Sequence, residues 1–485
     1  MKLYELIKEL DCEVLQGQDN IDIESICWDS RKAASNSLFI CVKNKNVDRH
    51  DYALAAVNKG SIAIVVEHNI KDIPKEITII KVSDSKKAMA VISNWFYGEP
   101  SKKINLIGVT GTNGKTSVTY YIAKILELAG HKTGLIGTIE NSISGNKLKT
   151  EKLNPTTPDS IELQESFNEF LELGATDVVM EVTSTALDKD RVYGCDFDIG
   201  VFTNLTQDHL DEHGTMENYK KAKLKLFSLC RKGIVNADDP VLEDIKQCAA
   251  CDILTYGINN DADFRACNIE YSSEGVKFTL NLHGISKNII LNVPGRFSVY
   301  NALAAIGACY LSGITLNDII KGLKEIYGVP GRFETVNNNK NILAVVDYAH
   351  TPDSLEKILT SVKEINNGRI ITVFGCGGNR DKTKRSIMGK IAGRLSDFCI
   401  ITSDNPRLER PIDIINSIEQ GIKSTECIYK KIIDRKEAIL SALGEVKAGD
   451  AVVIAGKGHE NYQIIGDNTI HFSDREIIEE YFSNL

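Results

Sequence analysis

Residues 104–130 read INLIGVTGTNGKTSVTYYIAKILELAG, and this stretch decides the fold. An apolar run rich in β-branched residues leads into a turn with Gly111 and Gly114, and an amphipathic segment follows. This order is typical of a buried strand, a phosphate-binding loop and the helix that the loop opens. The glycines allow backbone N–H groups to point inward, and the helix start near Lys115 adds its positive end. Lys115 can reach the outer phosphates of a nucleotide, and the Thr116 hydroxyl can hold Mg²⁺.

The spacing departs from the strict phosphate-loop pattern, which would place a glycine where Val109 stands. The match is therefore to a shorter variant. The alternative is a glycine-rich turn from strand to helix that binds no ligand. Phosphate binding is favoured because the Lys115-Thr116 pair follows the glycines and directly precedes a helical pattern.

Length and composition limit the class of protein. The chain has 485 residues, of which 42% are hydrophobic and 25% charged, so we expect a soluble α/β protein of about three domains. No apolar run approaches the ~20 residues that span a bilayer, and the N-terminus has no signal-peptide pattern, so we expect a cytoplasmic protein without membrane insertion. A net charge of −9 argues against a general nucleic-acid surface. We interpret the twelve cysteines as reduced packing residues and expect no zinc site.

Strand and helix patterns alternate along the whole chain and predict three units. Residues 1–100 form a small α/β domain, residues 101–328 a central phosphate-loop domain with a parallel sheet, and residues 329–485 a Rossmann-like domain. In the first unit, the WDSR segment at residues 28–31 precedes a strand. It is either a polar pocket or a solvated turn, and the motif by itself favours the turn.

Polar side chains follow two apolar strands of the central unit. Glu181 ends the strand in DVVMEV, and Asn204, Asp208 and His209 follow the strand in GVFTN. Ligands gather at the carboxyl ends of parallel strands, and a buried carboxylate there needs a partner or a metal. Glu181 and His209 are therefore candidates for a Mg²⁺ cluster beside Thr116.

Four strand candidates of the third unit also end in polar or glycine-rich tips. The tips hold Asp347 and His350, residues 376–380, residues 404–407 and residues 456–460. If all four lie at one edge of a parallel sheet, they describe a second substrate site that faces the nucleotide.

Two helical segments of the central unit have an open interpretation. Residues 218–227, NYKKAKLKLF, look like a basic helix with a solvated face. Another helix is predicted to start near Val299, where the Asn301 amide could contact a base or cap the turn.

These segments together resemble one known family, the Mur ligases of peptidoglycan synthesis, and within it the group of UDP-N-acetylmuramoyl-tripeptide synthetases. The resemblance covers nearly the whole chain. The motifs that carry it are TGTNGKTS, MEVTSTALDKDR, NLTQDHLDEHG, YKKAKLKLF, PGRFSVYNALAA, VPGRFE, VDYAHTPDSL, GCGGNRDKTKR, SDNPR and AGKGHE.

The resemblance implies an ATP- and Mg²⁺-dependent amide-forming ligase that acts on UDP-N-acetylmuramoyl-L-alanyl-D-glutamate through an acyl phosphate. It implies roles for individual residues as well. Those for the ATP phosphates are Gly111, Thr112, Asn113, Gly114, Lys115, Thr116 and Ser117. The adenine, phosphates and ribose would meet Asn301, Arg332 and Asp347, in that order. The metal residues are Thr116, Glu181, His209 and Lys223, the last as a carbamate; Lys115, Lys223 and His209 are the implied catalytic residues.

For the nucleotide-sugar substrate the resemblance implies Ser30, Thr156, Thr157, Thr183 and Arg191. One departure is visible at residues 183–187, which read Thr-Ser-Thr-Ala-Leu, whereas the family has Ser-Ser-His-Ala-Leu. The family histidine is Thr185 here, so no role of that histidine is carried over.

The choice of amino acid follows from the DNPR motif, which resembles that of members adding meso-diaminopimelate. Arg407 offers a planar fork for the second carboxylate of that amino acid, which lysine lacks. The alternative for Arg407 is a surface ion pair with Glu409. The positions implied for the amino acid are Arg380, Asp404, Asn405, Pro406, Arg407, Gly456 and Glu460, with Glu460 facing the distal ammonium group.

Three other functions stay open on the sequence. One is a ligase of the same family that adds L-lysine, and another is folylpolyglutamate synthetase, which is not expected to combine WDSR with DNPR. The third, from a different class, is a nucleotide-binding scaffold without catalysis; the joint presence of Lys115, Glu181, Lys223 and His209 argues against it. We expect a monomer.

Overall fold

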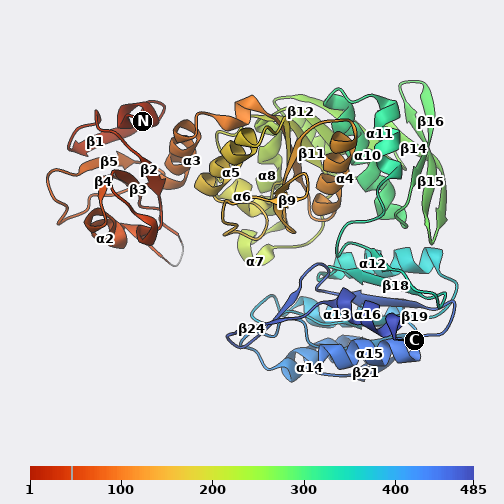
Figure 1. The fold of residues 1–485 in the computed structure, drawn as a ribbon. Helices are drawn as coiled ribbons and strands as arrows, with labels where there is room; N and C mark the ends of the chain where they lie inside the picture. The colour runs from red at the N-terminus through yellow and green to blue at the C-terminus, as the bar shows by residue number, and fades with distance from the viewer. Residues whose placement is uncertain (45–46, 485) are drawn as a thin grey trace.

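The computed structural model describes residues 1–44 and 47–484. Its described residues form three mixed sheets with helices packed against them, and a separate two-stranded ribbon (Figure 1). This architecture confirms the α/β class predicted from the alternating patterns. None of the described helices has both the length and the apolar character needed to cross a membrane.

The first sheet lies in the N-terminal part of the chain and has the strand order β1-β5-β4-β3-β2. β2 to β5 are parallel to their neighbours, and β1 is antiparallel to β5. The strands are β1 (Cys12–Gln16), β2 (Ser25–Cys27), β3 (Ser37–Ile40), β4 (Ser61–Val66) and β5 (Thr78–Val82). The helices beside them are α1 (Leu3–Ile7), α2 (Ala53–Asn58) and α3 (Ser85–Phe96).

The central sheet has eleven strands in the order β16-β15-β14-β13-β12-β11-β6-β10-β7-β8-β9. Strands β13, β12, β11, β6, β10 and β7 run parallel, as the sequence predicts for this unit. An antiparallel meander extends one edge and a short hairpin the other. The strands are β6 (Asn105–Thr110), β7 (Thr133–Ile136), β8 (Asn141–Ile143), β9 (Asn146–Lys147), β10 (Asp177–Glu181), β11 (Phe197–Phe202), β12 (Cys230–Asn236), β13 (Asp252–Gly257), β14 (Phe264–Ser272), β15 (Gly275–Leu282) and β16 (Ile285–Leu291).

Helices cover both faces of this sheet. They are α4 (Lys115–Leu128), α5 (Ser160–Glu172), α6 (Ser184–Asp188), α7 (Leu210–His213), α8 (Met216–Leu224), α9 (Leu242–Cys248), α10 (Arg296–Leu311) and α11 (Leu316–Lys324). α4 and α10 share one large apolar core with β6. α10 begins at Arg296, three residues before the predicted start near Val299, because Gly295 adopts a φ of 88° and the Ser298 hydroxyl bonds its carbonyl.

The third sheet has the order β17-β18-β22-β19-β20-β21. β18, β22, β19, β20 and β21 are parallel, so the four polar tips lie at one edge of one sheet, as predicted. The strands are β17 (Glu334–Val336), β18 (Leu343–Asp347), β19 (Ile370–Phe374), β20 (Phe398–Ile401), β21 (Ile428–Lys431) and β22 (Ala451–Ala455), and the ribbon is β23 (Tyr462–Ile465) with β24 (Asn468–His471). The helices beside the third sheet are α12 (Pro352–Ile365), α13 (Lys384–Leu395), α14 (Pro411–Ile422), α15 (Arg435–Glu445) and α16 (Asp474–Ser483).

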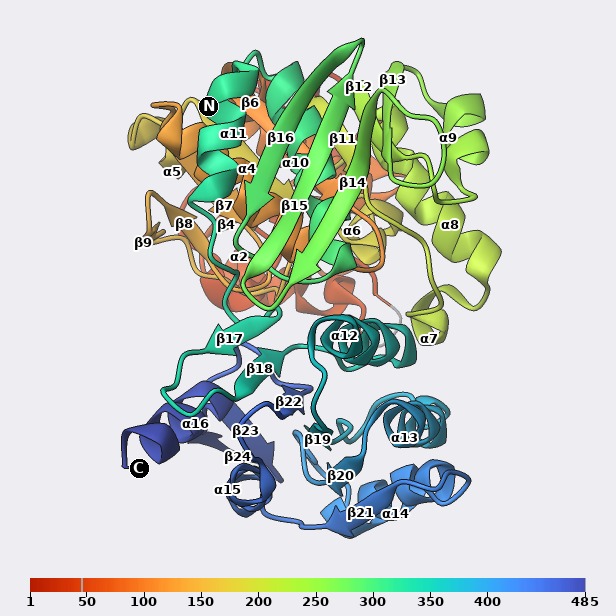
Figure 2. The same ribbon diagram turned by 90° about the vertical axis from the view of Figure 1, so that its right-hand side faces the viewer.

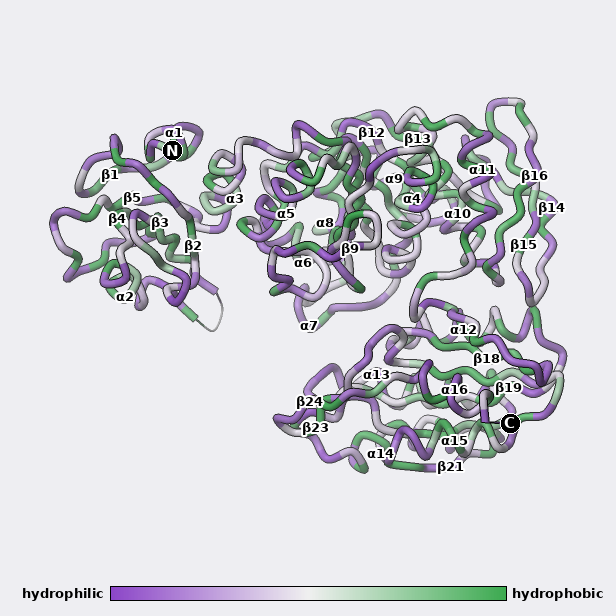
Figure 3. Tube along the Cα trace, in the orientation of Figure 1, coloured by the Kyte–Doolittle hydropathy of each residue, from purple (hydrophilic) through white to green (hydrophobic). Residues whose placement is uncertain are grey.

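The helix α12 lies between the central sheet and the third sheet, as two perpendicular views show (Figures 1 and 2). Hydrophobic stretches of the trace include the inner strands of the sheets, such as β18 and β19, whereas edge strands are more polar (Figure 3). α12 faces the loops that follow β6 and β11, because Asp353 of α12 accepts hydrogen bonds from Asn113 and Thr206.

Candidate active site

The phosphate loop connects β6 to α4, and two of its positions require glycine. Gly111 has a φ of 144° and Gly114 a φ of 88°. A Cβ atom at Gly111 would lie 1.9 Å from the Thr203 hydroxyl, and one at Gly114 would lie 2.7 Å from the Asn301 Oδ1. The loop is thus pressed between the end of β11 and the start of α10, with Asn301 against it.

Lys115 begins α4 and turns its amine back over the loop. Nζ donates to the Gly111 carbonyl at 2.9 Å and to the Thr112 carbonyl at 2.8 Å. Burial lowers the pKa of Lys115. Among the described residues no carboxylate forms an ion pair with this amine, so its hydrogen-bond partners are backbone carbonyls, while Glu181 and Asp208 act on it from farther away.

Lys223 is the buried lysine of the basic helix α8. It is 2% exposed, whereas the side chains of Lys220, Lys221 and Lys225 are 21%, 70% and 45% exposed. Its Nζ donates to the same Gly111 carbonyl at 2.7 Å. Burial, followed by the nearby charge of Lys115, holds the pKa of Lys223 well below its ordinary value. The solvated face expected for the basic helix is correct only for its other lysines.

Glu181 lies at the end of β10, next to β6, and is 1% exposed. Its Oε2 accepts hydrogen bonds from the Thr116 and Thr138 hydroxyls, each at 3.1 Å, and its Oε1 accepts from the Thr138 N–H at 2.7 Å. Arg332 reaches across from the third unit and donates to the Thr116 hydroxyl at 3.2 Å. A buried carboxylate and a hydroxyl are therefore adjacent at the phosphate loop.

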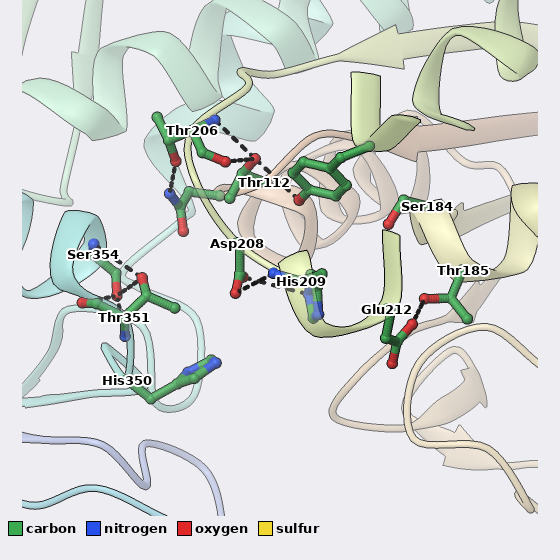
Figure 4. A network of polar contacts seen from close by, with 12 residues as sticks. Thr112, Ser184, Thr185, Thr206, Asp208, His209, Glu212, His350, Thr351 and Ser354 are labelled. Atoms are coloured by element: carbon green, nitrogen blue, oxygen red, sulfur yellow. Dashed lines mark hydrogen bonds and ion pairs between the residues drawn. The ribbon is translucent and has the colours of Figure 1, made fainter. Parts of the chain in front are cut away.

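His209 stands at the start of α7 in a left-handed conformation, with a φ of 52°. Its Nε2 lies 3.4 Å from an Asp208 oxygen (Figure 4). Its ring centroid lies 6.1 Å from that of Tyr219, and the Lys223 amine lies over that Tyr219 ring. Burial lowers the pKa of His209, with Asp208 opposing the shift. The structure brings His209 to the Lys223 side of the site, and among the described residues it makes no contact with Glu181.

Four residues expected at the nucleotide sugar surround the backbone of Glu181. The Thr157 hydroxyl donates to the Glu181 carbonyl at 2.9 Å and accepts from the Thr183 N–H at 3.0 Å. Arg191 donates to the Thr157 carbonyl at 2.9 Å, and the hydroxyls of Thr156 and Thr138 are 3.2 Å apart. These residues form a continuous polar network beside Glu181.

Thr185, at the family-histidine position, bonds Glu212 of α7 (Figure 4). Ser184 bonds His213 at 2.9 Å. The two α6 hydroxyls thus hold the helix that follows His209.

Ser30 lies apart from these residues, at the start of a short 3-10 helix that spans Ser30–Lys32. Asp29 caps this helix and pairs with the exposed Arg31, which lowers the pKa of Asp29 to about 2. The segment has the features of a solvated turn. Its link to the central unit is an ion pair of 2.9 Å between Lys32 and Glu151.

Asp347 and Arg332 lie together on the third unit. The Asp347 oxygens accept from the N–H groups of Phe333 and Ala349, each at 2.7 Å, and burial raises the pKa of Asp347 against the opposing charge of Arg332. The Arg332 guanidinium lies 4.5 Å from the centroid of the Tyr348 ring. Both side chains are therefore held in place by the third unit, and Arg332 also reaches Thr116 of the central unit.

The DNPR segment follows β20, and Arg407 in it has a φ of 53°. Its Nη1 donates to the Gly378 carbonyl at 2.9 Å, which connects two of the four strand tips. Glu409 pairs with Arg385 at 3.0 Å, and the Arg385 and Asn379 hydrogen bonds lower the pKa of Glu409 to about 2. The alternative of an ion pair between Arg407 and Glu409 is wrong, because Arg385 occupies that carboxylate.

Asn405 and Glu460 meet at the same edge. The Asn405 amide donates to Glu460 at 2.9 Å, and the Lys457 amine contacts Glu460 at 2.8 Å and the Asn405 oxygen at 3.2 Å. Gly456 fits closely here, because a Cβ atom would lie 2.7 Å from Asp404 Oδ2. Of the two remaining positions, Pro406 packs its carbonyl against Gly378, and Arg380 is exposed beside Gly377.

Sequence reasoning missed Lys457, Arg385 and Thr138. Lys457 and Arg385 are 0% and 2% exposed, so they are internal partners of the carboxylates at the third edge. The signal for Lys457 was a basic residue inside a glycine-rich strand tip, and Arg385 stands in the first turn of the predicted helical segment after such a tip; a basic residue at either place also fits a surface position. Thr138 had no signal, because the contact to Glu181 depends on the pairing of β7 with β10.

Known proteins resemble this chain over its whole length. A Mur ligase middle domain matches residues 109–309, and a Mur ligase glutamate ligase domain matches residues 331–458. UDP-N-acetylmuramoyl-L-alanyl-D-glutamate--2,6-diaminopimelate ligase 2 of Clostridium acetobutylicum is 49% identical over 482 residues, 99% of each chain. The enzyme of the same name, without the number, from Clostridium botulinum is 45% identical over 489 residues, 100% of each chain.

Solved structures agree with these matches. A structure of UDP-N-acetylmuramoyl-L-alanyl-D-glutamate--2,6-diaminopimelate ligase superposes with a TM-score of 0.72 at 31% identity, covering 100% of this chain and 99% of the other. MurF ligase from Thermotoga maritima in complex with ADP has a TM-score of 0.63 at 19% identity, covering 95% and 97%, and shares the fold. This chain belongs to the Mur ligase family.

Proposed function

We propose that this protein is the ATP-dependent ligase that adds meso-diaminopimelate to UDP-N-acetylmuramoyl-L-alanyl-D-glutamate in peptidoglycan precursor synthesis. The relatives named above carry this activity in their names and match the full chain. The observation that carries the proposal for this molecule is the pair of strand edges. One edge lies beside Glu181 and holds two amines, Lys115 and Lys223, that form no ion pair within the part of the chain that the structure describes. The other edge holds the DNPR segment with Arg407.

The phosphate loop is the proposed site of the ATP phosphates. Residues 111–117 supply backbone N–H groups and the Lys115 amine, and Arg332 already reaches the loop at Thr116. Asn301 lies against Gly114 and is proposed to contact the adenine, and Asp347 the ribose. The carbonyl contacts of Lys115 are exchangeable for phosphate oxygens, because an amine gains more from an anion than from a neutral acceptor.

The residues at Glu181 fit Mg²⁺. A carboxylate and a hydroxyl in direct contact are oxygen donors of the kind that this ion prefers, and neutral His209 fits a second ion. Thr116 and Glu181 would hold the first ion, and His209 with Lys223 the second. Bound Mg²⁺ supplies positive charge beside the phosphoryl group that is transferred.

Lys223 is proposed to act as a carbamate. An unprotonated amine adds to CO₂ and releases one proton, and the lowered pKa of Lys223 favours that unprotonated form. The product has carboxylate-like oxygens, which can ligate a metal where an ammonium group would repel it. Tyr219 and the Gly111 carbonyl hold the side chain in place.

The reaction joins two steps. A carboxylate oxygen of the dipeptide attacks the γ-phosphorus of ATP, which breaks the bond to ADP and forms an acyl phosphate. The amine of meso-diaminopimelate then attacks the acyl carbon, phosphate leaves, and the amine loses a proton. This chain's own residues bind, orient and neutralise charge, which are the main contributions to phosphoryl transfer.

The substrate positions follow the geometry of the two edges. Thr156, Thr157, Thr183 and Arg191 surround Glu181 and are proposed to bind the nucleotide sugar, with Ser30 of the first unit at its UDP end. At the third edge the proposed amino-acid residues are Arg380, Asp404, Asn405, Pro406, Arg407, Gly456 and Glu460. Arg407 would hold the distal carboxylate in a bidentate pair.

The three units divide this work. We propose residues 1–100 for the UDP substrate, 101–328 for ATP and 329–485 for the amino acid, in a protein that acts as a monomer in the cytoplasm. The ion pair of Lys32 with Glu151 and the bond of Arg332 to Thr116 are contacts between the proposed units.

An assay with purified protein tests the proposal. UDP-N-acetylmuramoyl-L-alanyl-D-glutamate, ATP and Mg²⁺ are supplied with either meso-diaminopimelate or L-lysine, and ADP and the tripeptide product are measured. We expect product with meso-diaminopimelate and far less with L-lysine. A preference for L-lysine would refute the amino-acid assignment, and no ADP release with either would support the scaffold function instead.

A further inference from the structure

Asp353 stands on α12, at the boundary between the central sheet and the third sheet, and none of the roles above uses it. Its Oδ2 accepts from the Asn113 amide at 2.5 Å and from the Thr206 hydroxyl at 3.0 Å. The Lys357 amine lies 2.9 Å from the same oxygen. Two of these three partners belong to the central unit, so this one carboxylate is a direct polar contact between units.

The two central partners come from the two loops that carry the proposed chemistry. Asn113 is inside the phosphate loop, two residues before Lys115. Thr206 lies in the loop after β11, three residues before His209. The carboxylate of Asp353 therefore contacts both loops at once.

These loops are also bonded to one another, which makes the contact stiff. The Thr112 hydroxyl accepts from the Thr206 N–H at 3.0 Å and donates to its carbonyl at 3.1 Å (Figure 4). The Asn113 carbonyl accepts from the Thr203 hydroxyl at 2.6 Å, and its N–H donates to the Asn204 side chain at 3.1 Å. The phosphate loop and the His209 loop therefore hold Asp353 as one hydrogen-bonded unit.

The other side of the contact is rigid as well. Thr351 and Ser354 form a reciprocal capping box at the start of α12, which fixes the helical turn on which Asp353 stands (Figure 4). The strand β18 leads directly into this turn and pairs with β22, whose tip holds Lys457 and Glu460. The position of α12 against the phosphate loop therefore sets the position of the amino-acid edge.

We propose that Asp353 is a positioning residue for the ligase reaction. Its carboxylate holds the third unit against the phosphate loop and the His209 loop, so that the amino-acid edge and the acyl-forming edge face one another at a fixed separation. A charged acceptor suits this task, because its hydrogen bonds are about twice as strong as neutral ones. The kinetic part of this inference rests on the function proposed above, and the structural part does not.

Three single variants and one double variant test it. Asp353→Ala removes the carboxylate. Thr206→Val removes one of its hydrogen-bond donors from the central unit and leaves the sequence of α12 unchanged. Lys357→Met is the matched control, since it removes the ion pair within α12 and leaves both contacts between the units. The double variant Asp353→Ala/Thr206→Val measures whether the two side chains act through one contact.

The readouts are the radius of gyration by small-angle X-ray scattering without nucleotide, the dissociation constant of ADP by calorimetry, and kcat/KM for meso-diaminopimelate. For Asp353→Ala we expect a larger radius of gyration and a loss of about tenfold or more in kcat/KM, the size that follows from losing hydrogen bonds to a charged group. ADP affinity should change by less than about threefold, because the phosphate-binding N–H groups remain. The double variant should resemble Asp353→Ala, and Lys357→Met should resemble the wild type.

An unchanged radius of gyration with unchanged kcat/KM in Asp353→Ala would overturn the inference. Additive losses in the double variant would also overturn it, as would a loss of ADP affinity equal to the loss in kcat/KM, because Asp353 would then be part of nucleotide binding. If Asp353→Ala does not fold, Thr206→Val decides by the same readouts. Should the wild type form no product, the proposed function fails, and scattering with ADP binding still tests the contact.

Discussion

Buried basic side chains lie at both strand edges of this protein, but the two edges treat them differently. At the phosphate loop, Lys115 and Lys223 donate to the Gly111 carbonyl and pair with no carboxylate among the described residues. At the amino-acid edge, Lys457 pairs with Glu460 at 2.8 Å and Arg385 with Glu409 at 3.0 Å. The first edge holds amines that lack an anion, and the second holds ion pairs that are complete.

This difference in ion pairing indicates that the basic residues of the first edge bind a ligand, whereas Lys457 and Arg385 of the second edge stabilise the fold. The buried Lys115 amine, whose hydrogen bonds go to carbonyls, gains strongly when an anionic ligand arrives, because the anion compensates for the desolvation of its charged form. A buried ion pair gains little from a ligand, but breaking it leaves an uncompensated charge. We therefore expect substitutions at the first edge to reduce catalysis and those at Arg385 to reduce stability.

The largest effect is expected for Lys115→Met. Removing the amine from the phosphate loop should lower kcat by about a thousandfold, the upper size for loss of one preorganised donor to a developing charge. Steady-state ADP release measures it, and the melting temperature should not fall, because a buried amine without a carboxylate is removed. Lys124→Met, on the exposed face of α4, is the control and should keep full activity. A kcat within tenfold of wild type would place the amine outside the reaction.

The second effect is on stability. Arg385→Met should lower the free energy of unfolding by about 2 kcal/mol, because Glu409 loses its two hydrogen bonds from the buried guanidinium and keeps only the exposed Lys382 as a charged partner. Chemical denaturation followed by circular dichroism measures this change. Lys382→Met removes the other charged partner of the Glu409 carboxylate. The Lys382 side chain is 71% exposed, so this variant should change the free energy of unfolding by less than about 1 kcal/mol. Equal losses in both variants would remove the distinction between the two edges.

Arg407→Ala comes third and tests the cationic side chain of the DNPR segment, which has no carboxylate partner among residues 1–44 and 47–484. We expect kcat/KM for meso-diaminopimelate to fall about 30-fold, the size of a lost hydrogen bond to a charged group, with the KM for ATP nearly unchanged. Arg410→Ala, whose side chain is 79% exposed, is the control. Equal losses for both substrates would mean that Arg407 has a structural role.

The smallest effect concerns pH. The lowered pKa of Lys223 means that, between this pKa and about 10.4, the unfolded chain binds more protons than the folded one. The free energy of unfolding should therefore rise with pH through that window, and Lys223→Met should lose part of the rise. Denaturation in CO₂-free buffer at several pH values from 7 to 10 measures the slopes. Lys221→Met is the control, because its side chain is 70% exposed, and it should keep the wild-type dependence of the free energy of unfolding on pH. The same dependence in Lys223→Met would contradict a lowered pKa of Lys223.

Local patterns predicted much of this fold correctly. The central unit has the parallel strands that were predicted, and the four tips of the third sheet share one edge as expected. These features depend on hydrophobic period and on the parallel pairing that short strand-helix units impose, and both are local. Prediction was weaker for the 3-10 turn at Ser30, where the motif indicated a solvated turn and the family resemblance a substrate contact.

By itself the sequence determined the class of fold, the phosphate loop and the residues that approach it, because these rest on spacing along one strand, one turn and one helix. Only the tertiary structure decided which lysine of α8 is buried, that Arg385 and not Arg407 pairs with Glu409, and that Asp353 joins α12 to the phosphate loop. The two contacts join residues that are far apart in the chain. The lysines of α8 are close in sequence and differ in the side of the helix that they occupy. Burial and charge pairing arise when whole elements pack together, so no local pattern contains them.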